Sequence, residues 1–266
     1  MRVRKLIDRY FIKQPRLRRF VTAALEPNRD VDINLSGANL RINTRREHGY
    51  LRASRLVRKN STLSDECSTI MNLFAMIRDG DTFVDVGANV GLFTHSLSRL
   101  ANLYPNFSQV AIEAHPDTYA RLSARESDRI AYFNLAMGDK EGEHVFVDGA
   151  VSHVFTAVEK QNAYNIATET ITVKMQRLDR LDLEGDSLVV KIDVEGQEMN
   201  VLKGAEGLFA DGRVSVVYLD GYDDPAINDL LLGHGFKLFS GRNLKPIQGK
   251  TFSLLAIHPR RLPASS

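Results

Sequence analysis

The amino-acid sequence predicts an α/β fold with a mostly parallel sheet, on three observations. From residue 82 onward, apolar runs of strand length alternate with segments of helical periodicity. The apolar run 188–192 is nearly continuous, which is typical of a strand covered on both faces in a parallel sheet. The run 82–84 leads into a glycine turn at 87–91 and then a helical segment, the arrangement of a nucleotide-type pocket. The length of 266 residues suits one such domain with a short N-terminal extension.

The first quarter of the chain is predicted to lie outside this sheet. Residues 3–13 have apolar side chains at helical spacing and a basic opposite face, so they predict an amphipathic helix. Residues 31–43 alternate in polarity and predict a small hairpin that turns at Gly37. A helix is then predicted over residues 64–77.

Seven strands and four helices are predicted to follow, with one interruption. Between about residues 137 and 177 the pattern changes to short alternating segments, which predict an inserted hairpin or flap. The chain therefore divides into a basic extension at 1–60 and a folded domain at 61–260. The predicted strands are 82–86, 109–114, 130–135, 188–193, 214–220, 236–240 and 251–257, and the helices are 91–101, 117–126, 197–209 and 225–233.

The charge is unevenly distributed. Residues 1–59 contain 16 Lys and Arg against five acidic residues, although the whole chain has a net charge of only +2. A basic end on an acidic body predicts an anionic partner, such as a phosphorylated or lipid-linked acceptor, a membrane surface or a nucleic acid. We expect the helix at 3–13 to pack on the domain or on a second subunit, with peripheral membrane contact as the alternative.

Other classes of protein are disfavoured by composition. Cys67 is the single cysteine, so an intramolecular disulfide and a cysteine-based metal cluster are excluded, which suits a cytoplasmic location. No uncharged apolar run approaches the roughly 18–20 residues of a transmembrane helix. No basic stretch is interleaved with aromatic residues, so a nucleic acid is not the favoured partner.

The turn DVGANVG at 85–91 points to a cofactor class. It is not a dinucleotide fingerprint, because Asn89 stands where G-x-G-x-x-G requires glycine. A carboxylate at Asp85 would repel a pyrophosphate, but it suits the cationic S-adenosylmethionine, whose ammonium group we expect it to orient. Backbone N–H groups at the start of the helix are expected to face the ligand. The cofactor residues predicted here are Asp85, Gly87, Ala88, Asn89 and Gly91.

Glu113 ends the second predicted strand, 22 positions after Gly91. A carboxylate at that place can accept hydrogen bonds from both ribose hydroxyls of a nucleoside. NAD-binding folds use the same device, so this residue does not by itself separate the two cofactor classes.

Together these motifs resemble the FkbM family of methyltransferases over roughly residues 60–258. The resemblance implies the class I methyltransferase (Rossmann-like) fold, with a seven-stranded sheet flanked by helices. It also implies S-adenosylmethionine as cofactor and a hydroxyl acceptor, often on a sugar or natural product, with Ala114, Asn134 and Ala136 enclosing the adenine. This chain departs from the family at the end of the fifth strand, where Asp220 replaces the more usual Glu. The matching segments are GDTFVDVGANVG at 80–91, IEAHP at 112–116, NLAMGD at 134–139 and VKIDVEGQE at 190–198.

The predicted catalytic neighbourhood is Asp193, Glu195, Asp220 and His153. Asp193 and Glu195 follow the fourth core strand, where either carboxylate could take the acceptor's proton or hold its hydroxyl; Asp193 is also expected beside the cofactor. Asp220 ends the neighbouring strand. Asp193 and Asp220 together could therefore hold one Mg²⁺ ion, which would polarise a substrate oxygen. His153, in the insertion, is a second candidate base. The sequence does not divide the roles of base, acceptor binding and metal ligation among them.

Two rival functions stay open at this point, and a third is disfavoured. A basic N-terminus is compatible with an RNA ribose methyltransferase, and a retained pocket is compatible with a non-catalytic S-adenosylmethionine-binding protein. A nicotinamide oxidoreductase would need a third glycine and an apolar residue at position 85, and the chain has neither. The acceptor and the oligomeric state, including a homo-oligomer, are not specified by the sequence.

Overall fold

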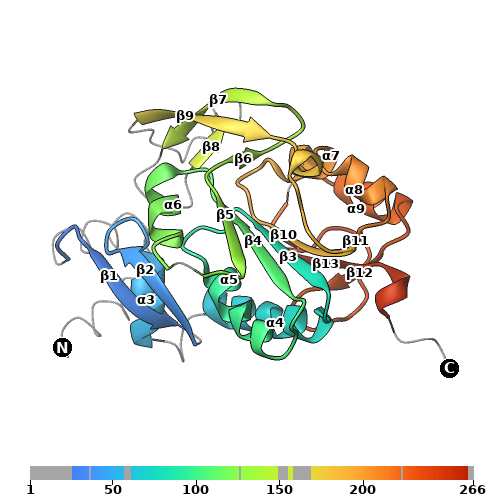
Figure 1. Cartoon of the computed structure of the whole chain (residues 1–266), viewed down its shortest axis with the longest axis horizontal. Coiled ribbons are helices and arrows are strands. Elements are labelled where there is room, and N and C mark those ends of the chain that lie inside the picture. The colour runs from blue at the N-terminus through green and yellow to red at the C-terminus, as the bar shows by residue number, and fades with distance from the viewer. Residues whose placement is uncertain are drawn as a thin grey trace.

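A computed structural model of the chain describes residues 26–35, 37–56, 61–125, 127–148, 155–157, 169–222 and 224–262. Its central feature is a seven-stranded sheet of order β12-β13-β11-β10-β3-β4-β5 (Figure 1). β13 is antiparallel to both of its neighbours, and every other pair is parallel. The predicted, mostly parallel seven-stranded sheet is confirmed. Its strands are β3 (Asp81–Val86), β4 (Ser108–Ile112), β5 (Ile130–Phe133), β10 (Ser187–Ile192), β11 (Val214–Asp220), β12 (Lys237–Ser240) and β13 (Ser253–Ile257).

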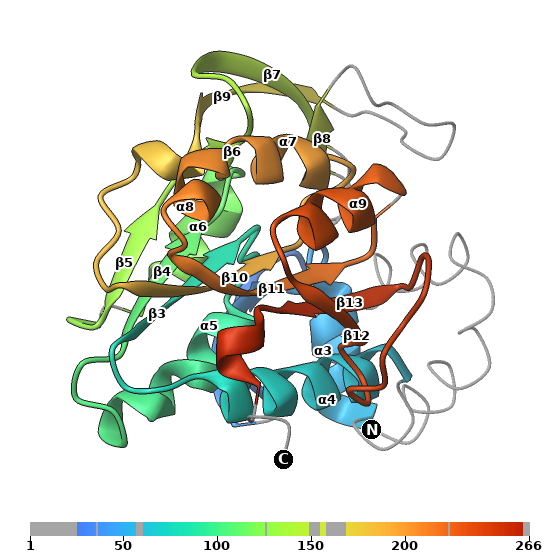
Figure 2. The ribbon, with the colours of Figure 1, turned by 90° about the vertical axis from the view of Figure 1, so that its right-hand side faces the viewer.

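Helices cover both faces of this sheet. Figure 2 shows α3, α4 and α5 below it and α7, α8 and α9 above it. The helices below are α3 (His48–Leu56), α4 (Ser61–Met76) and α5 (Leu92–Leu97), which continues into the 3₁₀ turn η2 (Ser98–Asn102). Those above are α7 (Glu198–Lys203), α8 (Glu206–Ala210) and α9 (Ala226–Gly233), while α6 (Pro116–Leu122) follows β4. Two further 3₁₀ turns are η4 (Leu178–Arg180) and η5 (Pro259–Arg261).

One helix prediction was wrong, and one helix was not predicted. The single helix predicted over 197–209 is two helices, because the Gly204 carbonyl accepts the N–H of Asp179 at 2.9 Å instead of continuing the helix. A Cβ on Gly204 would lie 1.9 Å from the carbonyl oxygen of Gly138, so only glycine allows this close approach. The helix α3 was not predicted at all.

Strand alternation divides the core into two layers. Val84 of β3 and Val190 of β10 point toward the α7–α9 layer, and Phe83 and Val189 point toward α4 and α5. All four side chains are almost completely buried. Apolar residues on both faces explain why these strands are continuous apolar runs in the sequence.

The insertion forms a separate four-stranded sheet of order β6-β9-β7-β8, which lies at the top of the molecule in Figure 1. β7 and β9 pair antiparallel over their whole length, so the predicted hairpin is confirmed and is part of a larger sheet. The strands are β6 (Ala136–Met137), β7 (Gly142–Asp148), β8 (Phe155–Ala157) and β9 (Glu169–Gln176).

The N-terminal hairpin is confirmed as β1 (Asp30–Leu35) and β2 (Ala38–Asn43), joined through Gly37 at a φ of 88°. Leu40 and Ile42 of this hairpin are fully buried in the same hydrophobic cluster as Leu97 of α5. The hairpin therefore packs on the layer of helices below the main sheet. The amphipathic helix predicted at 3–13 lies outside the described residues.

Candidate active site

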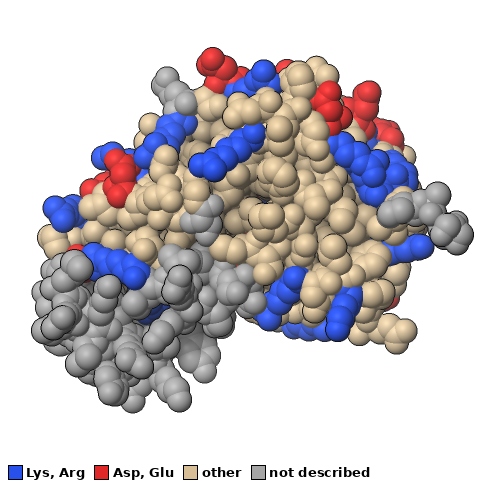
Figure 3. All heavy atoms as spheres, turned by 90° about the horizontal axis from the view of Figure 1, so that it is seen from below, with Lys and Arg blue, Asp and Glu red and all other residues tan. Residues whose placement is uncertain are grey.

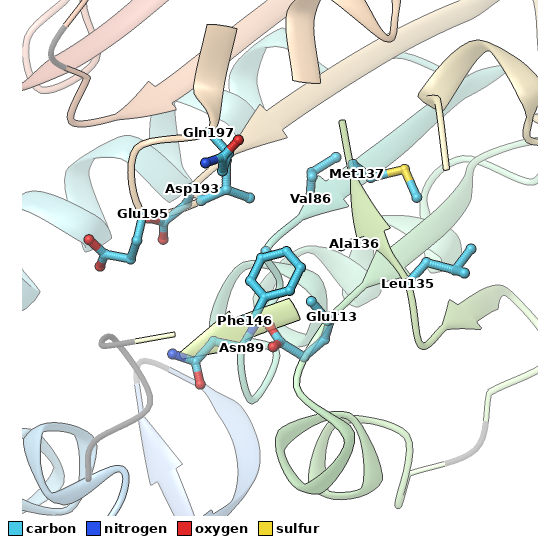
Figure 4. Close-up of a pocket in the computed structure, with 13 residues that line it drawn as sticks. Val86, Asn89, Glu113, Leu135, Ala136, Met137, Phe146, Asp193, Glu195 and Gln197 are labelled. Carbon is cyan, nitrogen blue, oxygen red and sulfur yellow. Dashed lines mark hydrogen bonds between the residues drawn. The ribbon is translucent and has the colours of Figure 1, made fainter. Parts of the chain in front are cut away.

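A pocket opens at the carboxyl end of the parallel strands, between the main sheet and the inserted sheet. In Figure 4, Val86, Leu135, Ala136 and Met137 lie on one side and Asp193, Glu195 and Gln197 on the other. Asn89 and Glu113 lie between the two groups, with Phe146 of β7 beside them. The remaining lining residues are Gly87, Ala114 and Val194. One wall is thus apolar and the opposite wall carries carboxylates.

The glycine turn brings β3, β4 and β10 together at this pocket. Gly87 has a φ of 72°, and a Cβ on it would lie 2.0 Å from the carbonyl oxygen of Asp193, so the position requires glycine. The N–H groups of Gly87 and Ala88 both donate to the Ile112 carbonyl at 2.9 Å. The N–H of Gly91, the N-cap of α5, donates to Ala88.

The expectation that N–H groups at the start of the helix face a ligand is therefore not met at Gly91, and protein carbonyls also accept the N–H groups of Gly87 and Ala88. The N–H of Asn89 is likewise used, since it donates to Oε2 of Glu113 at 2.9 Å. Asn89 itself has a φ of 51°, a left-handed conformation that Asn tolerates better than most residues. The turn thus positions Glu113 instead of contacting a phosphate.

Glu113 is buried at the floor of the pocket. Its Oε1 accepts the N–H of His115 at 2.9 Å, which complements the Asn89 contact on Oε2. Burial raises the pKa of Glu113 to about 6, although these two hydrogen bonds oppose the shift. Each carboxylate oxygen has a second lone pair, so the group can still accept a hydroxyl from each side.

The three residues expected around an adenine are placed differently. Ala114 and Ala136 line the pocket. Asn134 is exposed and outside the lining, and its Nδ2 donates to the carbonyls of Glu113 and Ala114 at 2.8 and 3.0 Å. Asn134 therefore fixes the segment that carries the pocket residues, and its expected place around an adenine stays a prediction.

Asp85 lies below the pocket instead of in it, which corrects its predicted role in orienting an ammonium group. Its side chain is completely buried, and Oδ2 accepts the hydroxyl and the N–H of Thr94 at 2.6 and 3.2 Å. Nζ of Lys191 lies 3.0 Å from Oδ1. The reason is strand alternation, because Val86 points into the pocket and Asp85 must point toward α5.

Lys191 links three elements beneath the pocket floor. Its Nζ donates to the Gly87 carbonyl at 2.7 Å and lies 3.4 Å from Oδ2 of Asp193. Burial alone would lower the pKa of Lys191, but Asp85 and Asp193 outweigh it and raise the pKa. The lysine is therefore a fixed cation that holds the glycine turn against the end of β10.

Asp193 and Glu195 lie side by side on the carboxylate wall. The Asp193 side chain is 40% exposed, and its backbone N–H donates to Val86 at 3.0 Å. Glu195 is exposed at the rim, yet surrounding atoms displace much of its water. That desolvation, followed by repulsion from Asp193, Glu198 and Asp220, raises the pKa of Glu195 to about 7.

Asp220 ends β11, next to β10, but does not line the pocket. The Tyr218 hydroxyl donates to its Oδ1 at 3.1 Å. Burial, followed by repulsion from Asp193, raises the pKa of Asp220 to about 6. Among the described residues, no group of three or more His, Cys, Asp or Glu could hold a metal ion, so the Mg²⁺ hypothesis gains no support. His153 lies outside the described residues.

Phe146, Leu135, Met137 and Gln197 line the pocket but were missed by sequence reasoning. Leu135, Met137 and Gln197 lie within motifs already identified, at 134–139 and 190–198, and membership of those motifs was the available signal. No sequence signal marks Phe146, because its position depends on how the inserted sheet folds over the pocket.

One ion pair anchors that inserted sheet. Nη1 and Nη2 of Arg46 donate to the two carboxylate oxygens of Asp148 at 3.0 and 2.6 Å. Although burial opposes the shift, Arg46 lowers the pKa of Asp148. Nη2 of Arg46 is also 2.8 Å from Nε2 of His115, the N-cap of α6. Residues after the N-terminal hairpin thus connect β7 with the segment that follows Glu113.

On the face that Figure 3 presents, the Lys and Arg side chains of the described residues lie in several separate groups. Within the described residues, none of the helices combines the length and apolar character that crossing a membrane requires.

A comparison with family models identifies the family of this chain. The model of the "Methyltransferase FkbM domain" matches residues 85–238. The chain is 28% identical over 171 residues to the hexuronic acid methyltransferase AglP of Haloferax volcanii, an alignment that covers 61% of this chain and 66% of that protein.

Solved structures give more distant similarities. The methyltransferase FkbM of Methylobacillus flagellatus is 17% identical, with a TM-score of 0.45, over 72% of this chain and 47% of that chain. The plantazolicin methyltransferase BpumL in complex with SAH is 10% identical, with a TM-score of 0.33, over 71% and 57% of the two chains. The chain thus spans just under two thirds of the curated relative and about half of the first solved structure.

Proposed function

The chain belongs to the FkbM methyltransferase family, and from that premise we propose that it transfers the methyl group of S-adenosylmethionine to a hydroxyl oxygen of a sugar. The observation that carries the proposal is the pocket itself, in which buried Glu113 faces a wall formed by Asp193 and Glu195. A site with three carboxylates suits a cationic cofactor and a hydroxyl acceptor, and it disfavours a pyrophosphate.

The residues present fit the proposed cofactor. Leu135, Ala136 and Met137 offer an apolar wall for an adenine ring, and Glu113 offers two oxygens for the ribose hydroxyls. Asn89, in the turn after β3, and Asp193, just after β10, would hold the methionine end. Asp85 contributes indirectly, since it holds Lys191, which holds the glycine turn.

When bound, S-adenosylmethionine supplies a methyl group attached to a positively charged sulfur. The protein's part is alignment of the acceptor and removal of its proton. Glu195, with a pKa of about 7, is suited to take the hydroxyl proton near neutral pH. Asp193 lies beside it and remains near Lys191, so it is suited to hold the acceptor hydroxyl by accepting a hydrogen bond.

A sugar acceptor is supported by the relative at 28% identity, which is named as a hexuronic acid methyltransferase. The test is a radiolabelled methyl-transfer screen of the full chain against sugars and glycoconjugates, with and without a chelator. We expect label in an alkali-stable ether on a sugar, and we expect Asp193→Asn to lower turnover while S-adenosylmethionine affinity is largely kept. Label transferred only to RNA, or binding without turnover on any hydroxyl acceptor, would contradict the proposal.

A further inference from the structure

Arg46 connects two parts of the proposed cofactor pocket, although it precedes the segment 85–238 that matches the family model. It lies between the N-terminal hairpin and α3. Its guanidinium group reaches Asp148, at the end of β7, and the ring of His115, which follows β4. One side chain of the N-terminal segment therefore contacts both the inserted sheet and the segment that carries Glu113.

Arg46, Asp148 and His115 form one compact cluster. Nη1 and Nη2 of Arg46 donate to the two oxygens of Asp148, a bidentate geometry that the planar fork of arginine provides. Nε2 of His115 lies 3.3 Å from Oδ2 of Asp148 and 2.8 Å from Nη2 of Arg46. The side chains of His115 and Asp148 are almost completely buried, so salt screens this cluster less than a surface ion pair.

The backbone that carries Arg46 is held independently of that cluster. The N–H groups of Arg46 and Glu47 donate to Asn43, to its side-chain oxygen at 3.2 Å and its carbonyl at 3.0 Å. The buried carboxylate of Glu47 accepts Nη2 of Arg121, on α6, at 2.8 Å. Figure 1 shows α6 between the N-terminal hairpin and the inserted sheet. Because α6 begins directly after His115, one helix holds both sides of the cluster.

Asp148 connects the cluster to the pocket through β7. Residues two apart on a strand point to the same face, so Asp148 and Phe146 project from β7 on the same side, about 7 Å apart along the strand. Phe146 lines the pocket, and Figure 4 shows its ring beside Glu113 and Asn89. A contact that fixes Asp148 therefore also fixes the position of the Phe146 ring.

His115 connects the same cluster to the carboxylate expected to bind the ribose. Its backbone N–H donates to Oε1 of Glu113 at 2.9 Å, and its Nδ1 accepts the N–H of Asp117 at 3.1 Å. The cluster thus holds Glu113 and Phe146 in a fixed relation to each other. An aromatic ring beside Glu113 keeps water from the carboxylate, and hydrogen bonds to a carboxylate are stronger where water is excluded.

We propose that Arg46 is a positioning residue for cofactor binding, which holds the inserted sheet over the pocket and so keeps Phe146 beside the ribose bound to Glu113. This inference rests on the proposed function and adds that the N-terminal segment completes the cofactor site. Arg46 does not line the pocket, so it acts through Asp148 and His115.

The experiment measures the dissociation constant of S-adenosylmethionine by titration calorimetry of the full chain, at a temperature where circular dichroism shows each variant folded. Arg46→Met should weaken binding about tenfold, within the range of an indirect coupling between two sites. Asp148→Asn should weaken it as well, and it tests the same contact if Arg46→Met does not fold. Arg41→Met, which removes an exposed arginine from β2, is the matched control and should change the constant less than about twofold.

A double-mutant cycle separates positioning from general stability. Phe146→Ala alone should weaken S-adenosylmethionine about tenfold, because it removes the ring that shields the ribose. In that background Arg46→Met should weaken binding less than about threefold further, because the side chain that Arg46 positions is gone. A role in stability alone would lower the melting temperature of Arg46→Met, but its effect on binding would not depend on Phe146.

An unchanged dissociation constant in folded Arg46→Met or in Phe146→Ala overturns the inference, and so does an undiminished effect of Arg46→Met in the Phe146→Ala background. An equal loss in Arg41→Met would assign the effect to the charge of the N-terminal segment and overturn it too. If wild type binds S-adenosylmethionine and only these effects are absent, the positioning role fails alone. If wild type does not bind it, the proposed function fails as well.

Discussion

Lys191 and Asp85 occupy paired positions on the adjacent strands β10 and β3, and their charged groups lie 3.0 Å apart in the buried core. Lys191 also bonds the Gly87 carbonyl, so this pair connects the two central strands to the glycine turn that shapes the pocket. The pair is a structural support for the site. Because it lies under the pocket floor and holds the glycine turn, its loss is expected to weaken cofactor binding.

Lys191→Met should destabilise the protein by about 3–5 kcal/mol, because it leaves Asp85 as a buried charge without its cation. The double variant Asp85→Asn/Lys191→Met should recover a large part of that loss. Urea unfolding of both variants measures these changes in the free energy of unfolding. Lys203→Met, at an exposed position on α7, is the control and should change that free energy by about 0.5 kcal/mol or less. A loss below about 1 kcal/mol for Lys191→Met would show that the pair is not a support.

Gly87→Ala should disturb the junction of β3 and β10. The left-handed backbone alone costs an alanine roughly 1–2 kcal/mol, and its Cβ would also overlap the Asp193 carbonyl oxygen. We expect a larger loss of unfolding free energy than that figure, together with weaker S-adenosylmethionine binding. Gly49→Ala in α3 is the matched control, since nothing lies within 4 Å of its Cβ, and it should be neutral or slightly stabilising. Equal stability of the two variants would contradict the geometry.

The raised pKa of Glu113 predicts a pH dependence of stability in the ligand-free protein. A folded pKa of about 6, above the ordinary value of 4.5, means that the folded state binds this proton more tightly than the unfolded state. Its contribution to stability is therefore present below pH 4.5 and is lost as the pH rises through 6. Over this window, wild type should lose about 2 kcal/mol relative to Glu113→Gln. Parallel pH profiles of the two proteins would refute the assignment.

The raised pKa of Glu195 predicts the pH dependence of turnover. If Glu195 takes the acceptor's proton, kcat/KM should rise with pH and level off above about 7. Glu195→Gln should lower kcat by about 10²–10⁴-fold and remove that limb of the profile. Glu206→Gln, at an exposed position on α8, should leave kcat and the rising limb of the pH profile unchanged. A limb near pH 7 that persists in Glu195→Gln would assign the proton transfer to another group.

The sequence predicted the sheet well and the site in part. Strands such as β10 and β11 are marked by continuous apolar runs, and Glu113 is marked by its place at a strand end. Asp85 was misplaced because its partner Lys191 is 106 positions away along the chain, and only the strand register brings them together. Local patterns carry no information about such pairings.

The same limit applies to Phe146. It reaches the pocket because the inserted sheet folds over it, and that sheet is bonded to Arg46 through Asp148, across 102 positions. The helix α3 was missed for a different reason. Its segment HGYLRASRL is amphipathic, but it has few apolar residues and a glycine in its first turn, so its helical propensity is weak.

The most direct measurement is titration calorimetry of the full chain with S-adenosylmethionine and, separately, with NAD. Wild type should bind S-adenosylmethionine and not NAD, and Glu113→Ala should weaken that binding by about 1.5–3 kcal/mol, with Glu206→Ala unchanged. No binding of S-adenosylmethionine, an unchanged dissociation constant in Glu113→Ala, or binding of NAD instead would contradict the account.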